Sequence, residues 1–507
     1  MDAQVDVSKS NLADSVPLLD TKEPQAITTT RRWPAITISF VCGCILCGIL
    51  AALLTVHRLA GSPGLLWKHG QSYSPNEDVS KTGATCKTEK AGGIPVACCI
   101  ADTNFDCGRQ IGKLMRKRIR KVVKWYDDLR DCCDRQEAMC SHFLRVNKAK
   151  YPAYYEEIRG TAKGAGVSVK TLLYANIQEI YDLCESSLLG AHPSVPSWVA
   201  KLRNASNATL GVDLPWAGGH RPVGLLQRQR PRGRLGCTDY LLRSNERSII
   251  GHNEDAAALD YDWEVNYFVN ATIGTHRIFA YVYAGQLPGN SWGFNSKGMV
   301  LTMNALSARA RVGLATNFVS RHILDAGGFT DALDRAMVPN QSSGSSWNIG
   351  RTQRCKKSHG GAGVQLANVE TSPNSSSSLS VGEDNFTTHE NIYLRLLDAN
   401  KDAGFDPKSS LHRHRRLMAL PMAKSADDVL NALSDTADKR YPVFRDGGKP
   451  DTDTNIVTTV FDLQASSARV WVQARRGHVS HDPTPAKKPA DFSLDLCTVS
   501  FLHGSNV

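Results

Sequence analysis

Residues 236–256 read GCTDYLLRSNERSIIGHNEDA, and this stretch determines how the rest of the chain is interpreted. Its apolar runs on either side of Asn245-Glu246 predict two strands joined by a turn. Such a hairpin carries Asp255 back beside Cys237, although the two residues lie 18 positions apart in the sequence. The preceding segment, 186–236, is rich in Pro, Gly and Arg and is typical of a loop or linker. The sequence therefore predicts a cysteine and a carboxylate close together, directly after an exposed loop.

The cysteine count makes Cys237 a candidate for a free thiol. The chain has 14 cysteines, of which three lie in an apolar segment near the N-terminus. The remaining eleven are an odd number, so in an oxidising compartment one thiol stays free or pairs elsewhere. The alternative for Cys237 is a buried or disulfide-bonded structural cysteine. Cys98-Cys99 and Cys132-Cys133 lack the CxxC spacing of zinc sites, so we expect no metal.

An uncharged segment, Trp33–Val56, predicts a transmembrane helix, because about 20 apolar residues cross a bilayer. A cleaved signal peptide is the alternative, but its apolar core spans only about 7–15 residues. Six Asn-x-Ser/Thr sequons, usable only on the lumenal or extracellular side, all follow the segment: Asn204, Asn207, Asn270, Asn340, Asn374 and Asn385. We therefore expect a type II membrane protein with residues 1–32 in the cytosol.

The expected cytosolic tail contains an acidic dileucine pattern that runs from Asp14 to Leu18-Leu19. Such a pattern directs membrane proteins to endosomes and lysosomes, and a disordered tail without a signal is the alternative. The expected location is therefore the endosome or lysosome, or else the cell surface.

Beyond the membrane, residues 57–236 are predicted to be helical up to the linker, and residues 237–507 to mix helices and strands. Apolar steps of three and four residues predict a helix over Arg109–Arg130 with a solvated basic face, and further helices over 154–163 and 169–183. The predicted later strands are Ser248–His252, Ile278–Ala284, Met299–Asn304, Ile456–Leu463 and Arg469–Val472. The predicted later helices are Phe318–Asp325, Thr330–Met337 capped by Thr330, and Ser425–Leu433 capped by Ser425. Two Ser-rich stretches, Gln341–Ser346 and Ser372–Ser380, are expected to be flexible surface loops. The predicted fold class is α+β.

The chain has 507 residues, 41% of them hydrophobic, which is enough for a large core. The net charge is +11, but the basic residues are scattered and no zinc-finger or RNA-binding motif organises them, so we expect no nucleic-acid partner.

An ordered set of motifs along residues 100–475 resembles the isopenicillin N acyltransferase and β-alanyl-dopamine hydrolase family of N-terminal-nucleophile (Ntn) cysteine hydrolases. The set comprises YYEEIRGTAKGAGVSVKTLLYANIQEI, GCTD, GHNEDA, WGFNSKGMVLTMNAL, NVETSP, HENIYL, SSLHRHRRL and TTVFDL. The resemblance implies an αββα four-layer sandwich, here preceded by the transmembrane helix. It also implies a precursor that cuts itself between Gly236 and Cys237, after which the α-chain and the catalytic β-chain (237–507) stay associated. No cofactor is implied.

The resemblance assigns roles to three residues. Cys237 is the nucleophile, and the α-amine freed by self-cleavage is its base, because a thiol beside an amine is a good nucleophile near neutral pH. Asp255 orients that amine, although an ordinary hairpin-end aspartate would look the same. Asn391 donates its side-chain amide to the oxyanion, and a turn or capping asparagine is the alternative.

Further family positions are expected to line the site. The backbone at Met303-Asn304 corresponds to the segment that supplies a second oxyanion donor. Ser410 and Arg413 resemble a Ser-x-x-Arg element near the substrate, and a structural helix face is the alternative. Some relatives that cleave bile-acid amides carry Arg in the position of His252. An unperturbed histidine is largely uncharged above about pH 7, so we expect neutral or cationic N-acyl amines to be preferred to amides that carry a carboxylate.

The expected function is hydrolysis of small N-acyl amides through an acyl-enzyme on Cys237, with aminoacyl conjugates of biogenic amines such as β-alanyl-dopamine as a candidate class. The first alternative is an acyltransferase, in which an amine instead of water takes the acyl group. The second is a binding ectodomain without activity, which the joint presence of Cys237, Asp255 and Asn391 disfavours.

Overall fold

The computed structural model describes residues 29–32, 89–184, 236–257, 265–352, 355, 363–401, 407–448, 450–473 and 484–502. The predicted transmembrane segment, the dileucine pattern, the linker and the sequons at Asn204 and Asn207 lie outside these residues. Among the residues described, no helix is both long and apolar enough to span a bilayer.

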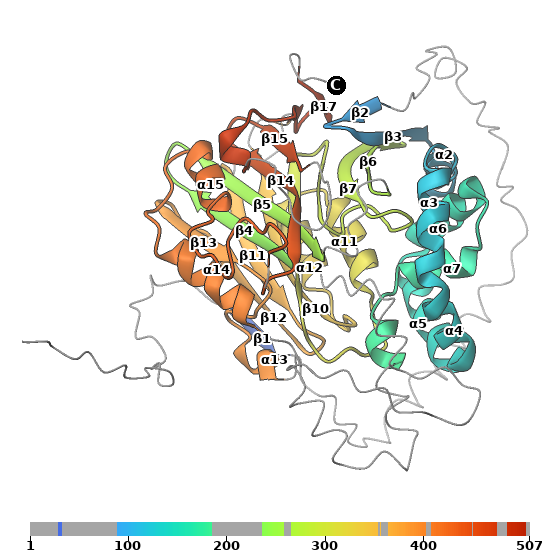
Figure 1. The fold of residues 1–507 in the computed structure, drawn as a ribbon. Helices are drawn as coiled ribbons and strands as arrows, with labels where there is room; N and C mark the ends of the chain where they lie inside the picture. The colour runs from blue at the N-terminus through green and yellow to red at the C-terminus, as the bar shows by residue number, and fades with distance from the viewer. Residues whose placement is uncertain are drawn as a thin grey trace, which may run out of the picture.

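Two sheets form the centre of the molecule (Figure 1). In the described part of the chain, the larger sheet has the order β1-β12-β11-β10-β9-β8-β7-β6-β3-β2 and the smaller has the order β13-β4-β5-β14-β15-β16-β17. The strands of the larger sheet are β1 (Thr29–Arg32), β2 (Glu89–Ala91), β3 (Ile94–Ala101), β6 (Tyr267–Ile273), β7 (His276–Val282), β8 (Trp292–Asn295), β9 (Met299–Leu306), β10 (Gly344–Arg351), β11 (Gln365–Thr371) and β12 (Ser375–Ser380). The strands of the smaller sheet are β4 (Gly236–Arg243), β5 (Ser248–Ala257), β13 (Asn385–His389), β14 (Asp453–Asp462), β15 (Ser467–Val472), β16 (Phe492–Asp495) and β17 (Ser500–Phe501).

Helices cover the outer face of each sheet, so the molecule has four layers in the order helix, sheet, sheet, helix. One apolar core joins the larger sheet to α2 (Asn104–Leu114), α3 (Arg116–Val123), α4 (Asp127–Arg135), α5 (Glu137–Lys150), α6 (Pro152–Ala165), α7 (Val169–Ala175), α11 (Thr316–Leu324) and α12 (Phe329–Ala336). A second core fills the space between the sheets, with Phe268 and Trp292 meeting Phe461 and Phe492. A third core packs α14 (Lys408–Met418) and α15 (Ala426–Leu433) on the smaller sheet, and α13 (Leu397–Lys401) precedes them. The predicted mixed α and β class is confirmed.

The N-terminal part supplies strands as well as helices. β3 pairs in parallel with β6, with Val96 opposite Phe268, so residues before and after the proposed cut share one sheet. The prediction of a purely helical segment there was therefore wrong. Residues 94–97 at the start of β3 are buried in succession, which fits a strand covered on both faces there.

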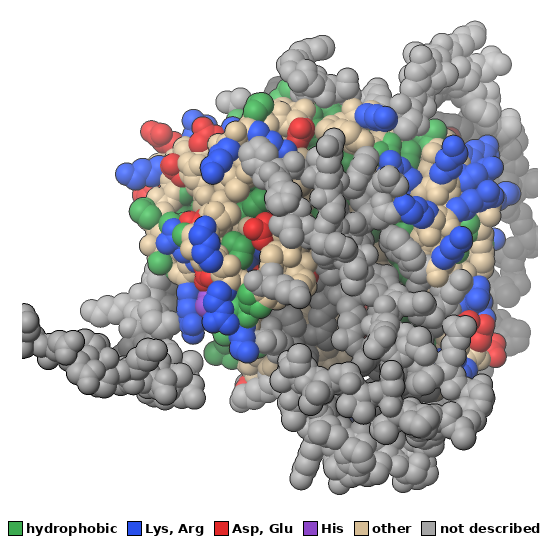
Figure 2. Space-filling view, in the orientation of Figure 1, with side chains coloured by type: hydrophobic (Ala, Val, Ile, Leu, Met, Phe, Trp, Pro, Cys, Tyr) green, Lys and Arg blue, Asp and Glu red, His purple; other side chains and the backbone are tan. Residues whose placement is uncertain are grey.

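The helix predicted over Arg109–Arg130 is three segments, because α2 ends at Leu114 and the turn 124–126 separates α3 from α4. Its basic face is exposed, and Figure 2 shows Lys and Arg gathered over α2 and α3. Two of these side chains also bind the end of α6: Arg116 donates to Gly164 O and Arg120 to Ala165 O. These cations therefore satisfy carbonyls at a helix C-terminus, besides being solvated.

Two smaller predictions about loops and caps were also wrong. Ser375–Ser380 is strand β12, paired with β11, and Gly344 starts strand β10. A Ser-rich composition therefore did not distinguish strand from loop in this segment. Gly328, not Thr330, precedes α12, whereas Ser425 caps α15 as predicted by accepting from the Asp428 amide.

Four disulfides join described cysteines: Cys99–Cys107, Cys132–Cys184, Cys133–Cys140 and Cys355–Cys497. Cys237 is the free cysteine of the described residues, as predicted, and it is buried. β1 lies within the predicted cytosolic tail but pairs with β12. A strand lies on the same side of a membrane as its sheet, so this pairing and a cytosolic position for Thr29–Arg32 exclude each other.

Candidate active site

The hairpin formed by β4 and β5 places Cys237 at the centre of the molecule, with a side chain that is fully buried between the two sheets. The turn at Ser244–Arg247 sets a register in which Cys237 lies opposite Glu254 and Gly236 opposite Asp255. Side chains alternate between the two faces of a strand, so Cys237 and Glu254 share the face toward the larger sheet. Asp255 points to the other face. The sequence correctly placed the two strands together, but the acid beside the thiol is Glu254.

Asn391 and Arg413 hold the backbone of Cys237. The Cys237 amide donates to Asn391 Oδ1 at 3.1 Å, and Arg413 donates to the Cys237 carbonyl at 2.7 Å. Arg413 also donates to Asn391 Oδ1 at 3.0 Å and to Ser410 Oγ at 3.3 Å. The structure therefore brings Arg413 and Asn391 to Cys237, and Ser410 to Arg413. Because a guanidinium only donates, this contact also sets the orientation of the Asn391 amide.

The side-chain NH₂ group of Asn391 donates to Ala305 O at 3.1 Å. The Met303 amide, part of the predicted second oxyanion donor, donates to Ser291 O at 2.9 Å. In this uncut chain both groups thus have acceptors within the protein, and the oxyanion role stays a prediction for both.

Gly236 lies against a buried cluster of charges on the face of β4 opposite the thiol. A Cβ at this position would come within 1.8 Å of Arg445 Nη1, so no other residue fits without moving that guanidinium. Arg445 Nη1 is 3.6 Å from Asp255 Oδ2, and among the described residues neither atom has a hydrogen bond. Asn455 donates to Asp255 Oδ1 at 3.1 Å. Burial raises the pKa of Asp255 to about 7, against the opposing effect of Arg445.

A buried acid–imidazole–acid cluster lies on the thiol's face of the hairpin, and the sequence analysis missed most of it. His252 Nδ1 is 2.9 Å from Asp239 Oδ2, and His252 Nε2 is 3.0 Å from Glu254 Oε2. Tyr283 donates its hydroxyl to Glu254 Oε1, and Ser291 donates to Glu254 Oε2. Glu254 Oε2 is in turn 3.7 Å from Cys237 Sγ. The signal that would have found Glu254 is the hairpin register, since a turn centred on Asn245-Glu246 pairs position 237 with position 254.

The cluster changes the charges expected at the site. Burial by itself lowers the pKa of His252, but Asp239 and Glu254 outweigh it and raise this pKa to about 10. The expectation that His252 is uncharged above pH 7 was therefore wrong. Burial, and then Glu254, raise the pKa of the Cys237 thiol well above its ordinary value in the uncut chain.

Asn304 reaches the cluster through its side chain, at one end of a chain of amide hydrogen bonds across the larger sheet. Asn304 donates to Asp239 Oδ2 at 2.7 Å and accepts from Asn348, which in turn accepts from Asn368. Arg395 donates to Asn368 Oδ1 at the far end. The inner face of the sheet is thus polar opposite the thiol, and each amide orients the next.

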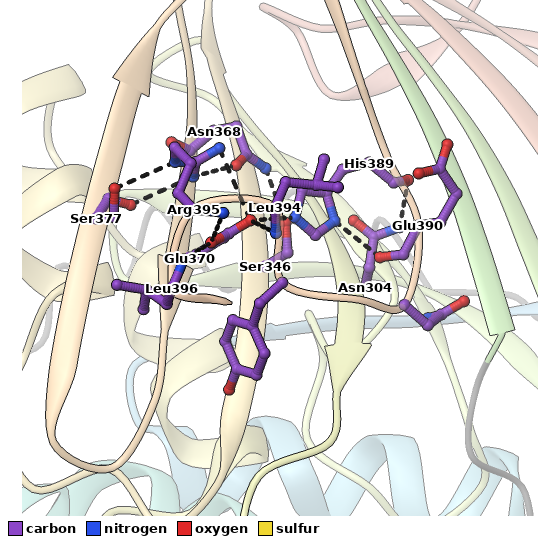
Figure 3. Close-up of polar contacts among 12 residues, drawn as sticks. Asn304, Ser346, Asn368, Glu370, Ser377, His389, Glu390, Leu394, Arg395 and Leu396 are labelled. Carbon is purple, nitrogen blue, oxygen red and sulfur yellow. Dashed lines mark hydrogen bonds and ion pairs between the residues drawn. The ribbon is translucent and has the colours of Figure 1, made fainter. Parts of the chain in front are cut away.

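Glu370 on β11 holds the segment that carries Asn391 (Figure 3). It accepts from the backbone amides of Leu394, Arg395 and Leu396 at 2.7, 3.0 and 3.0 Å. It also binds His389 Nε2 at 2.9 Å. Burial by itself raises the pKa of Glu370, but His389 and Arg395 oppose it, and with the backbone hydrogen bonds the pKa falls to about 2. Glu370 is therefore a charged anchor for the turn from 389 to 396.

Among the described residues, one group of side chains has the geometry to hold a metal ion: Cys237, His252 and Glu254, with ligand atoms within 4.8 Å of one another. His252 and Glu254 already satisfy each other there. Of the described sequons, Asn340 and Asn374 are exposed, while Asn270 and Asn385 are partly buried.

Comparisons with known proteins indicate the family to which this chain is similar. A model of the family "Acyl-coenzyme A:6-aminopenicillanic acid acyl-transferase" matches residues 242–476. The matched range includes Asp255, Asn391, Ser410 and Arg413, and begins five residues after Cys237. The β-alanyl-dopamine/carcinine hydrolase of Drosophila melanogaster is 22% identical over 391 residues, which are 73% of this chain and 89% of that protein. The family model and the Drosophila relative both support assignment of the chain to the isopenicillin N acyltransferase and β-alanyl-dopamine hydrolase family. The assignment indicates an amide hydrolase or an acyltransferase.

Solved structures are similar over less than half of the chain. An N-acylethanolamine-hydrolyzing acid amidase orthologue of Caenorhabditis elegans is 14% identical, covers 44% of this chain and 92% of its own, and has a TM-score of 0.31. A mutant conjugated bile acid hydrolase of Clostridium perfringens is 9% identical, covers 47% and 90%, and has a TM-score of 0.29.

Proposed function

We propose that this family member is a self-processing Ntn cysteine amidohydrolase with an αββα sandwich, which cleaves small N-acyl amides through an acyl-enzyme on Cys237. The observation that carries the proposal is that Cys237 is the free cysteine of the described residues, with its amide on Asn391 and its carbonyl on Arg413. A cysteine with a purely structural role would not need two polar side chains to hydrogen-bond its backbone amide and carbonyl.

Self-cleavage precedes turnover in this proposal. Cys237 Sγ attacks the carbonyl carbon of Gly236, the peptide C–N bond breaks, and the Cys237 nitrogen leaves as an α-amine that takes the thiol proton. Water then hydrolyses the thioester and leaves a carboxylate on Gly236. The new amine is held near Asn391 Oδ1 and serves as the base for the thiol.

Turnover repeats the same bond changes on a substrate. Sγ attacks the amide carbonyl, the amine departs with a proton, and water releases the acyl group from the thioester. The Drosophila relative is named for β-alanyl-dopamine and carcinine, so aminoacyl conjugates of biogenic amines are our proposed substrate class. The second candidate is an acyltransferase, which the family model's name supports. Varying the concentration of a free amine separates the two, because a transferase forms a new amide in proportion to it.

Intact mass and N-terminal sequencing of the full-length protein test the proposal. We expect a new chain of residues 237–507 with an N-terminal cysteine, and turnover of β-alanyl-dopamine. Cys237→Ala should abolish both, since both use the same sulfur. An active enzyme in one uncut chain would contradict the mechanism, and a cut among Arg228–Arg234 would point to an external protease.

We further propose a type II membrane protein whose C-terminal part is lumenal or extracellular, in endosomes, lysosomes or at the cell surface. In this arrangement Thr29–Arg32 is cytosolic and does not pair with β12, so the proposal stands against that pairing. The six sequons and the uncharged segment support this topology. Treatment with a glycan-removing amidase should lower the apparent mass. An unchanged mass would leave the topology without support, in line with the pairing of β1 to β12.

A further inference from the structure

Glu254 is a buried carboxylate in contact with the proposed nucleophile. Its Oε2 atom is 3.7 Å from Cys237 Sγ, and the side chain is fully buried. The two residues face each other across β4 and β5. The carboxylate is therefore next to any acyl group that becomes attached to this sulfur.

The position of Glu254 disfavours ionisation of the Cys237 thiol. A carboxylate beside a thiol opposes formation of the thiolate, which is the reactive form. If only nucleophilicity mattered, a neutral side chain would serve better at this position. The carboxylate must therefore have a role that offsets this cost, and neutralisation by a bound cation removes the cost.

The hydrogen bonds of Glu254 leave one acceptor position for such a cation. Oε2 is occupied by His252, Ser291 and the thiol, whereas Oε1 accepts from Tyr283 alone among the described residues. A carboxylate oxygen has about two acceptor positions, so one remains on Oε1. Tyr283 is itself only partly buried, whereas Glu254 is fully buried.

The acidic groups of the cluster also favour a bound cation. His252 lies between Asp239 and Glu254 and balances one of the two carboxylates. The cluster thus places two carboxyl groups against one imidazole, and all three side chains are buried near the sulfur. The guanidinium groups of Arg413 and Arg445 lie along the backbone and on the opposite face of β4, where they bind the Cys237 carbonyl and Asp255.

From this geometry we infer that Glu254 is the specificity residue for the acyl side of the substrate and binds the ammonium group of an aminoacyl amide. The inference rests on the proposed amidase function and narrows its substrates to amides whose acyl group carries a positive charge two or three bonds from the carbonyl carbon. The bound ammonium then takes the acceptor position on Oε1. It also lowers the repulsion between Glu254 and the thiolate, so the correct substrate helps to activate the nucleophile.

The test compares two amides of dopamine that differ in one group. β-Alanyl-dopamine carries an ammonium where N-butanoyl-dopamine carries a methyl group. We expect wild-type kcat/KM to favour the β-alanyl amide by roughly 10- to 100-fold, the range of one hydrogen bond to a charged group. Glu254→Gln keeps the shape but removes the charge, and should bring the ratio near one.

Asp239→Asn is the matched control, because it removes the same charge from the other side of His252 but does not contact the sulfur. It should keep most of the preference. An equal loss of both activities in Glu254→Gln, with the ratio unchanged, would overturn the inference and give Glu254 a role at the thiol. Failure of the wild type to cleave either amide would instead refute the proposed function.

A second measurement avoids variants that fail to fold or to cut themselves. β-Alaninamide and butanamide are compared as competitive inhibitors of the wild-type enzyme. We expect β-alaninamide to bind at least tenfold more tightly. Equal inhibition would overturn the inference whatever the variants show.

Discussion

At the scale of single residues, Asp255 is a buried carboxylate whose charge changes near neutral pH. Its pKa is raised to about 7, against an ordinary value of 3.8. A pKa raised by folding stabilises the native state below the unfolded value, and this stabilisation is lost as the pH rises through the folded value. The contribution of Asp255 to stability is thus greatest below about pH 4, falls as the pH rises to about 7, and changes little above that.

This direction of the pH dependence of stability can be tested in the Cys237→Ala chain, which we expect to stay uncut. Adding Asp255→Asn should reduce the fall in melting temperature between pH 5 and pH 8, because the amide stays neutral and keeps the acceptor for Asn455. The effect corresponds to up to a few kcal/mol, at about 1.4 kcal/mol per pKa unit. Scanning calorimetry across this range checks it, with the exposed Asp427→Asn as control. Parallel pH profiles with and without Asp255 would contradict the assignment.

Asn391 binds the backbone amide of Cys237, so we expect its removal to slow catalysis. Asn391→Ala deletes the acceptor shared by the Cys237 amide and Arg413. We expect the fold to persist and kcat to fall roughly 10²- to 10³-fold, the range for loss of one oxyanion donor. Steady-state kinetics on the cut enzyme give the value. A kcat like that of the wild type would remove Asn391 from the mechanism.

At the scale of elements, the turn from 389 to 396 depends on one carboxylate of a neighbouring strand. Glu370 of β11 accepts three successive backbone amides of this turn. A glutamine would present an NH₂ group to these donors and leave at least one without an acceptor.

Glu370→Gln should therefore loosen the segment that carries Asn391 while leaving every group around Cys237 in place. We expect self-cleavage and kcat to fall by about tenfold, less than in Asn391→Ala, with little change in KM. Cleavage rates and steady-state kinetics measure this, and the exposed Glu383→Gln is the matched control. Normal rates in Glu370→Gln would show that the sheet alone positions the turn.

At the scale of the whole molecule, the proposed cut falls between two parts that share a core and a sheet. β3 precedes the cut and β6 follows it, and the helices α2–α7 pack on strands from the second part. Residues 237–507 contain three cysteines, of which Cys355 and Cys497 are joined to each other and Cys237 is free. Packing, without a disulfide, therefore connects the two pieces.

We thus expect the two pieces to elute together from a sizing column in native buffer and to separate in detergent gels without a reducing agent. Burial of several large apolar side chains, each contributing about 1.5–3 kcal/mol, is enough to hold them in native buffer. Dissociation of the cut protein in native buffer would contradict the shared core, and a persistent single band in the gel would contradict the disulfide assignment.

The sequence alone predicted the hairpin, the free thiol, the mixed class and the later helices and strands, because these depend on local patterns and on counting. The alternation of β4 and β5, the capping Ser425 and the odd cysteine are all visible within short windows. The order of the motifs also indicated the family, and it singled out Asn391 and Arg413, which the structure places on the backbone of Cys237.

Only the tertiary structure showed which acid faces the sulfur and what charge His252 carries. Neighbouring residues of a strand point to opposite faces, so Glu254 and Asp255 differ by one position but occupy different environments. The pKa of His252 depends on Asp239 across the hairpin, and the position of Asn391 depends on Glu370 from a distant strand. Contacts of this kind join residues far apart in the chain at distances of a few ångströms, and no local pattern in the sequence determines them.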